Sequence, residues 1–174
     1  MTYIDESAFH GCTGLTSLTI PNSVTTICHE AFEDCKGLTY VIIGNGVTTI
    51  GSEAFKDCDN LNYVIIGSSV TTIEGTAFRN CDKLTDVYCY AETVPTTNSS
   101  AFYNTYIENA TLHVPEVSIG NYKNAAPWSG FGSIVALNGD VVPVTIRKCE
   151  TPTISFVNGE ITFTCKTDGV KYIS

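Results

Sequence analysis

The segments 31-AFEDCKGLTYVIIGNGVTTIG-51 and 54-AFKDCDNLNYVIIGSSVTTIE-74 are two copies of one pattern that recurs every 23 residues. The pair Ala-Phe stands at positions 8, 31, 54 and 77, and a fifth pair follows 24 residues later, at 101. Other positions keep the same period: Cys12, Cys35, Cys58 and Cys81; Leu15, Leu38, Leu61 and Leu84; Ile4, Ile27, Ile50 and Ile73. This register predicts a solenoid in which each repeat is one coil and neighbouring coils share a core.

Each repeat contains one clear strand and one shorter extended segment. The run from Leu38 to Gly44 is β-branched and aromatic and is too short for a helix, so it predicts a strand. Alternation places Val41 and Ile43 on the inner face of that strand, and Tyr40 and Ile42 on the outer face. The Val-Thr-Thr-Ile run predicts the second extended segment, and Ala-Phe suits a helical or 3₁₀ turn.

These elements predict a β-rich solenoid: a right-handed stack of about four and a half coils with a parallel sheet on one face. One phenylalanine per coil should lie in a single interior column, formed by Phe9, Phe32, Phe55 and Phe78. The column cysteines fill a small apolar position, so we expect Cys12, Cys35, Cys58 and Cys81 to be reduced and buried. Neighbouring coils about 4.8 Å apart would also permit disulfides, so distance alone does not decide.

The composition excludes several classes of function. The chain has 174 residues, of which 43% are hydrophobic and 16% charged, so it is not a disordered acidic segment. It carries 9 basic and 18 acidic residues, and this net charge of −9 argues against a nucleic-acid partner. No apolar run approaches the roughly 20 residues of a membrane-spanning helix. Catalytic sequence motifs are missing, so we expect no enzymatic activity, no catalytic residues and no cofactor.

Two groups of residues have the chemistry of metal ligands, but we expect neither to be a metal site. Cys28-His29-Glu30 with Cys35 offers zinc-ligand types, although the spacing is not typical of zinc and the equivalent positions vary between repeats. Aspartates near Asn80 could bind calcium weakly, but scattered aspartates in loops more often lie in solvated turns; these are Asp57, Asp59 and Asp82.

The outer face of the strands carries the most informative side chains. One predicted row contains Ser17, Tyr40, Tyr63, Asp86 and Thr111, and the next contains Thr19, Ile42, Ile65, Tyr88 and His113. Aromatic and apolar residues side by side on an exposed face are typical of interaction surfaces. The candidate ligand-binding residues are Tyr40, Ile42, Tyr63, Ile65, Asp86, Tyr88, Tyr90 and His113. Alternatively, these rows only stabilise the sheet, or the chain's own tail covers them.

The 23-residue period ends near residue 138, which predicts two domains, 1–138 and 139–174. In the second, Asn158-Gly159 lies between two alternating runs and predicts a β-hairpin. A two-residue turn there places Cys165 opposite residue 152 and Cys149 opposite residue 168. The two cysteines are then not direct cross-strand partners, and whether they form a disulfide stays open.

The pattern Ala-Phe-x-x-Cys-x-x-Leu, followed by the strand, resembles the BspA-like leucine-rich repeats of bacterial surface proteins. The resemblance covers about residues 1–138, and the stretch 110–131 looks like the closing segment of such arrays. It implies a non-enzymatic protein at the cell surface or secreted, which binds a protein such as a host matrix or bacterial surface protein through the strand face. Two alternatives are a structural spacer that presents a neighbouring domain and a carbohydrate-binding module that uses the tyrosines.

The ends of the sequence bear on location. The N-terminal residues lack the basic start and apolar run of a signal peptide. We expect the sequence to begin inside a repeat and to stop inside a second β module, so that this feature says little about the compartment.

Overall fold

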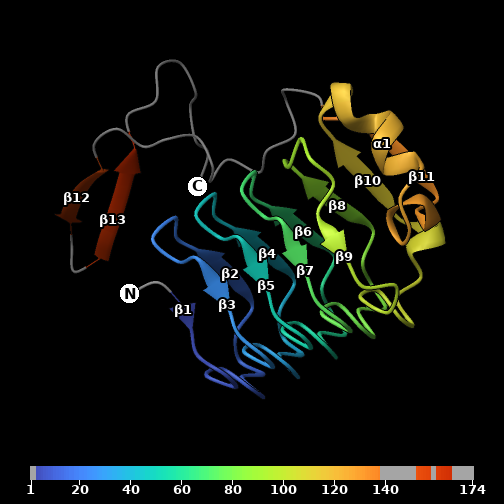
Figure 1. Cartoon of the computed structure of the whole chain (residues 1–174). Coiled ribbons are helices and arrows are strands. Elements are labelled where there is room, and N and C mark those ends of the chain that lie inside the picture. Colours follow the sequence, from blue (N-terminus) through green and yellow to red (C-terminus); the bar gives the residue numbers. More distant parts are fainter. Residues whose placement is uncertain (1–2, 138–151, 158–159, 166–174) are drawn as a thin grey trace. The chain divides into compact units, whose positions relative to one another are not determined.

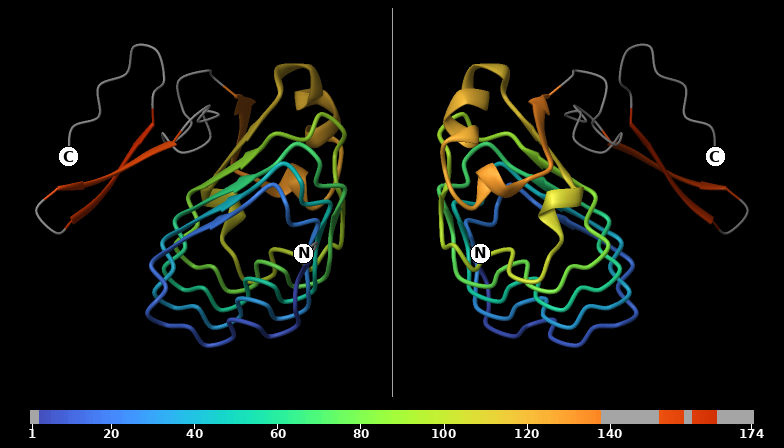
Figure 2. Two further views of the ribbon diagram at one scale, coloured as in Figure 1. Left: turned by 90° about the vertical axis from the view of Figure 1, so that its left-hand side faces the viewer. Right: turned by 90° about the vertical axis from the view of Figure 1, so that its right-hand side faces the viewer.

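The computed structural model describes residues 3–137, 152–157 and 160–165. The chain divides into two compact units, residues 1–137 and 138–174. In the first unit successive coils stack on one another, as the views along the stack show (Figure 2). The described residues of the second unit form a hairpin.

Two parallel sheets run along the stack (Figure 1). The larger has six strands in the order β11-β10-β8-β6-β4-β2. These are β2 (Ser17–Ile20), β4 (Tyr40–Ile43), β6 (Tyr63–Ile66), β8 (Asp86–Cys89), β10 (Thr111–Val114) and β11 (Ser133–Ala136). The smaller has five two-residue strands, β1 (Tyr3–Ile4), β3 (Thr26–Ile27), β5 (Thr49–Ile50), β7 (Thr72–Ile73) and β9 (Thr96–Thr97). Each coil therefore supplies one strand to each sheet, as the sequence predicts.

The strand register confirms the repeat period. Tyr40 pairs with Tyr63, and Tyr63 pairs with Asp86, so equivalent positions lie side by side. The later interval is longer, because β10 pairs Thr111 with Asp86 and His113 with Tyr88. Both rows predicted for the strand face are therefore formed.

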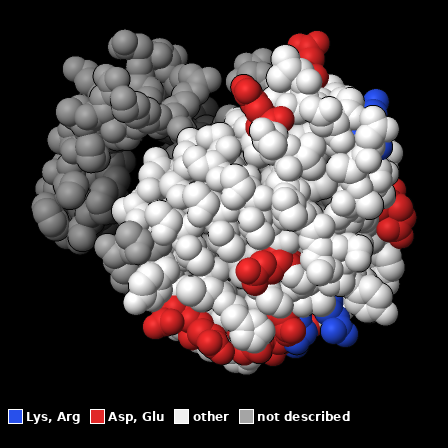
Figure 3. Space-filling view, viewed as in Figure 1, with Lys and Arg blue, Asp and Glu red and all other residues white. Residues whose placement is uncertain are grey.

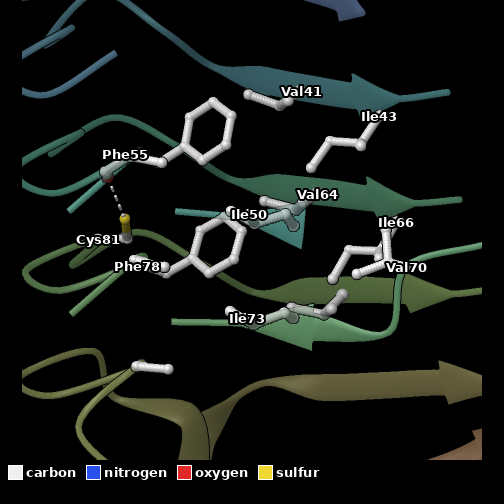
Figure 4. Packing of buried hydrophobic residues seen from close by; sticks show 14 of the residues in the cluster. Val41, Ile43, Ile50, Phe55, Val64, Ile66, Val70, Ile73, Phe78 and Cys81 are labelled. Carbon is white, nitrogen blue, oxygen red and sulfur yellow. Dashed lines mark hydrogen bonds between the residues drawn. The ribbon is translucent and has the colours of Figure 1, made fainter. Parts of the chain in front are cut away.

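The core lies between the two sheets, and its centre is the phenylalanine column (Figure 4). Consecutive rings stack with centroids 5.1, 5.3, 5.4 and 5.5 Å apart along the series Phe9, Phe32, Phe55, Phe78 and Phe102. Phe55 and Phe78 have no exposed surface. Phe9 belongs to the column but is 45% exposed, because in the described chain a coil packs on only one of its sides. The prediction that all four rings are interior is therefore wrong for Phe9.

The cysteine column has a regular hydrogen-bond pattern. The thiol of Cys81 donates to the backbone oxygen of Phe55 over 3.3 Å (Figure 4), and Cys58 and Cys35 repeat this contact with Phe32 and Phe9. These three thiols are buried, and all six described cysteines are free. Burial raises the pKa of Cys35 to about 11. Cys12 is exposed, so the prediction that it is inaccessible is wrong for the same reason as for Phe9.

The Ala-Phe segments are turns rather than the helical or 3₁₀ pieces that the sequence suggests. Each contains two residues with left-handed backbone conformation. The first precedes Ala-Phe, at Ser7, Glu30, Glu53 and Thr76, with φ between 52° and 58°. The second follows it, at Gly11, Asp34, Asp57, Asn80 and Asn104. Gly, Asp and Asn tolerate this region best, which explains their recurrence at the second position.

A closing segment packs on the last coil. It contains η1 (Ile107–Asn109), η2 (Glu116–Ser118), α1 (Ile119–Lys123) and η3 (Trp128–Gly130). Trp128 and Tyr122 are completely buried, and their rings meet edge to face with centroids 5.4 Å apart. Phe102 continues the phenylalanine column and contacts Trp128 and Phe131 edge to face. Aromatic rings thus cover the C-terminal end of the core.

The described part of the second unit is an antiparallel pair of strands, β12 (Pro152–Val157) and β13 (Glu160–Cys165). Pro152 pairs with Cys165 and Val157 with Glu160, which confirms the predicted hairpin and its register. Cys149 lies outside the described residues, so the question of a disulfide with Cys165 is not addressed.

Candidate ligand-binding face

The outer face of β4, β6, β8 and β10 brings the predicted ligand-binding residues together. Tyr40, Tyr63 and Asp86 form one row at the beginning of these strands, and Ile42, Ile65, Tyr88 and His113 form the next. Tyr90 follows β8 directly. Parallel pairing at one coil per strand is what places these residues side by side.

Two tyrosines form an ordered pair at the centre of this face. The rings of Tyr40 and Tyr63 stack with centroids 5.1 Å apart and planes within 3° of parallel. Both side chains are half-buried. Burial, and secondarily the neighbouring Tyr40, raises the pKa of Tyr63. Both phenols are therefore neutral near pH 7 and offer an apolar ring together with a hydrogen-bonding group.

Ile42, Ile65 and Tyr88 are buried, with 2%, 1% and 9% of their surface exposed. They form a small apolar cluster, separate from the main core, against which Tyr40, Tyr63, Tyr90 and Leu137 pack. The prediction that these three side chains are exposed is therefore wrong. Large neighbouring rings lie beside the shorter isoleucines on the same face, so the apolar surface is shared within a cluster. Any part that these three residues have in ligand binding stays a prediction.

One charged contact on this face was not predicted. His113 Nε2 lies 2.9 Å from Asp86 Oδ1, and the His113 ring stacks on Tyr88 with centroids 4.2 Å apart. The contact is diagonal, because Asp86 lies one row away from the Tyr88–His113 row. The sequence rows already place Asp86 two residues before Tyr88, but the diagonal contact needs the longer interval between β8 and β10 to be known. Asp86, Tyr90 and His113 are all partly exposed.

Charged residues gather away from the broad surface that Figure 3 presents. That surface is largely uncharged, and Asp and Glu lie along its lower edge together with a few basic groups. The net charge of the chain is −9. A ligand of this protein therefore meets an acidic molecule whose flat surfaces are mostly neutral.

The residues with metal-ligand chemistry are engaged in other contacts. Cys35 is buried and donates to Phe9, so it does not join Cys28, His29 and Glu30. Asp57 accepts a hydrogen bond from Asn80, and Asp59 lies 3.9 Å from the Lys36 ammonium group.

In the described chain, the potential metal ligands that come together are His10, Glu30 and Glu33. This group contains its own cation, because Lys56 Nζ lies 2.6 Å from Glu33 Oε1 and 2.7 Å from Glu53 Oε2. Hydrogen bonds from Glu33 and then Glu53 raise the pKa of Lys56. The arrangement is therefore an ion-pair network that links neighbouring coils.

Comparison with known proteins gives a consistent result. A family model described as "BspA type Leucine rich repeat region" matches residues 2–125 in six copies. A search of curated protein sequences gives no significant match. Within the described residues, no helix combines the length and apolar character needed to cross a membrane.

Two solved structures are similar to this chain. One is the leucine-rich repeat protein of T. pallidum, at 25% identity and a TM-score of 0.59 over 69% of this chain and 54% of that protein. The other is a leucine-rich cell surface protein of Faecalibacterium prausnitzii, at 25% identity and a TM-score of 0.45 over 79% of this chain and 39% of that protein. The chain thus spans about half the length of the T. pallidum protein.

Proposed function

Because the chain belongs to the BspA-type leucine-rich repeat family, we propose that residues 3–137 are a non-enzymatic module that binds a protein ligand through the face of the six-stranded sheet. The observation that carries this proposal is the stacked pair Tyr40–Tyr63 at the centre of that face. A location at the cell surface or outside the cell belongs to the same proposal, because repeats of this type resemble those of bacterial surface proteins.

The tyrosine pair has the properties of a binding hot spot. Tyrosine is enriched where protein interfaces gain most of their free energy, since its ring contributes apolar area and its hydroxyl a hydrogen bond. Stacking restricts both rings before the ligand arrives, so binding loses little side-chain entropy. The buried cluster of Ile42, Ile65 and Tyr88 supports the rings from below and keeps them in place.

The charge of the molecule selects the partner. With a net charge of −9 and Asp86 beside the tyrosine pair, the face favours a neutral or basic protein such as a matrix or bacterial surface protein. Long-range attraction of this kind is screened by salt, so the association should weaken as ionic strength rises.

The test is binding to immobilised extracellular-matrix and bacterial surface proteins by the wild type and by the double variant Tyr40→Ala, Tyr63→Ala. We expect the variant to lose binding by at least about 30-fold, which corresponds to about 2 kcal/mol at a hot spot. The matched control is Tyr103→Ala with Tyr106→Ala, which removes two tyrosines that are 58% and 56% exposed and lie outside the sheet. Its binding should equal that of the wild type.

The opposite result has a clear meaning. If the Tyr40–Tyr63 variant stays folded and binds every partner of the wild type with unchanged affinity, the strand face is not the binding site. The spacer function, in which the repeats only present a neighbouring domain, would then be the better account.

A further inference from the structure

A polar recess lies beside the strand face, between the turn that joins β6 to β7 and the turn that joins β8 to β9 (Figure 1). Its volume is about 300 Å³. The first turn lines it with Ser68, Ser69 and Thr71, and the second with Tyr90, Glu92 and Thr93. The strand-face proposal uses only Tyr90 from this set.

The recess forms where two regular features of the repeats end. In the first coils the turns are joined by side-chain amides, since Asn22 Oδ1 accepts from the Asn45 amide and Asn45 Oδ1 accepts from the Ser68 amide. The equivalent residue in the third coil is Ser68, whose hydroxyl makes no hydrogen bond within the described chain. The fourth coil is one residue longer at this point, so its turn departs from the stack.

The closing segment holds the longer turn in place. Tyr122 donates its hydroxyl to the Ala91 carbonyl over 2.8 Å, and Ser118 donates to the Glu92 carbonyl over 2.6 Å. Tyr122 is completely buried, and Ser118 is 2% exposed. Both contacts bind the backbone on either side of Glu92, so the wall of the recess is fixed before any ligand binds.

The lining has the chemistry of a sugar site. In the described chain, Ser69, Thr93 and the Glu92 carboxylate are free of hydrogen-bond partners and can pair with a ligand. A carboxylate accepts hydrogen bonds from neighbouring sugar hydroxyls, serine and threonine both donate and accept, and the face of one tyrosine packs on a pyranose ring. No Lys or Arg lines the recess, which disfavours anions, and a single ring is less than the aromatic cage that a quaternary amine requires.

We propose that this recess is a second binding site, which takes one pyranose unit of a neutral glycan. Its size lies at the lower end of the range for small-molecule pockets, about 300–1,000 Å³, as a single sugar ring requires. Binding of one unit in an open polar recess is weak, and a glycan chain gains affinity by repeated engagement.

The experiment is a titration of the ¹⁵N-labelled chain with the methyl glycosides of glucose, galactose, mannose and N-acetylglucosamine, followed by amide chemical shifts. At least one glycoside should shift the amides of residues 68–71 and 90–93 and leave those of the Ala-Phe turns unchanged. Glu92→Gln should weaken that binding about tenfold, because it removes a charge-assisted hydrogen bond. Ser69→Phe should abolish it by filling the recess, and the matched control Glu108→Gln, an exposed carboxylate elsewhere, should leave it unchanged.

Two results would overturn the glycan site. One is the absence of shifts at residues 68–71 and 90–93 with every glycoside up to about 100 mM. The other is a shift pattern that persists with equal affinity in both Glu92→Gln and Ser69→Phe. Tyr40→Ala with Tyr63→Ala should leave the glycoside titration unchanged, so failure of the protein-binding proposal is distinguishable from failure of this one.

Discussion

Phe9 and Phe55 occupy the same position in the repeat but differ in what surrounds them. Phe55 stacks between Phe32 and Phe78 and has no exposed surface, whereas Phe9 stacks only on Phe32 and is 45% exposed. The stability that one ring contributes should therefore depend on the number of coils that cover it.

Replacing Phe55 by Ala should lower the free energy of unfolding by about 3–5 kcal/mol, because it leaves a cavity inside the column. Phe9→Ala is the matched control and should cost about 1–2 kcal/mol, since about half of that ring already contacts water. Urea unfolding followed by circular dichroism measures both values. A loss below 1 kcal/mol for Phe55→Ala would mean that the column is not the core.

His29 gives the molecule a predictable response to pH. Burial alone lowers its pKa, but the hydrogen bond between Nδ1 and the Ser52 carbonyl and the nearby carboxylates Glu30, Glu6 and Glu53 outweigh that effect and raise it above 6.5. Because the pKa is higher in the folded chain, the protonated ring stabilises the fold below about pH 6.5, and this contribution is lost as pH rises through the folded-state pKa.

The free energy of unfolding should therefore decrease between about pH 6 and pH 8 more in the wild type than in His29→Gln. Urea unfolding at a series of pH values measures the difference. Identical pH profiles for the two proteins would show that the contacts of His29 with Ser52 and Glu30 contribute nothing to stability.

At the scale of the elements, the turns around Ala-Phe are where the sequence misled us. Their length and residue types suit a helical turn, yet each turn contains two left-handed residues. The aspartates and asparagines at the second position are a signal that could have been used, because these residues adopt positive φ readily. Glu30, Glu53 and Thr76 at the first position give no such signal, and there the stacking of coils overrides local preference.

Thr76 is the residue least suited to its turn, since a β-branched side chain is strained at its φ of 56°. Thr76→Gly should raise the free energy of unfolding by about 0.5–1 kcal/mol, because relief of the strain exceeds the added entropy of the unfolded chain. The matched control Thr72→Gly, within β7, should lower it by about 1 kcal/mol. A decrease for both variants of similar size would show that Thr76 carries no strain.

At the scale of the whole molecule, the period of 23 residues was enough to predict the order and register of the strands. The rows Tyr40–Tyr63–Asp86 and Ile42–Ile65–Tyr88 follow from it directly. The burial of Ile42 and Ile65 could not be predicted in this way, because periodicity assigns a side chain to a face but does not describe how neighbouring rings pack over that face. The polar recess depends on one additional residue in the fourth coil and on its contacts with the closing segment, which lies outside the repeat pattern.

The central claim is that the face of the six-stranded sheet binds a protein ligand, and hydrogen exchange of the complex tests it most directly. With a partner from the binding screen bound, peptides that cover Tyr40–Ile43, Tyr63–Ile66 and Asp86–Cys89 should exchange more slowly, while those of the short strands Thr49–Ile50 and Thr72–Ile73 should not change. Raising the salt concentration should reduce the protection in parallel with the affinity. Protection confined to the short strands or to the Ala-Phe turns would contradict the claim and place the ligand on another face.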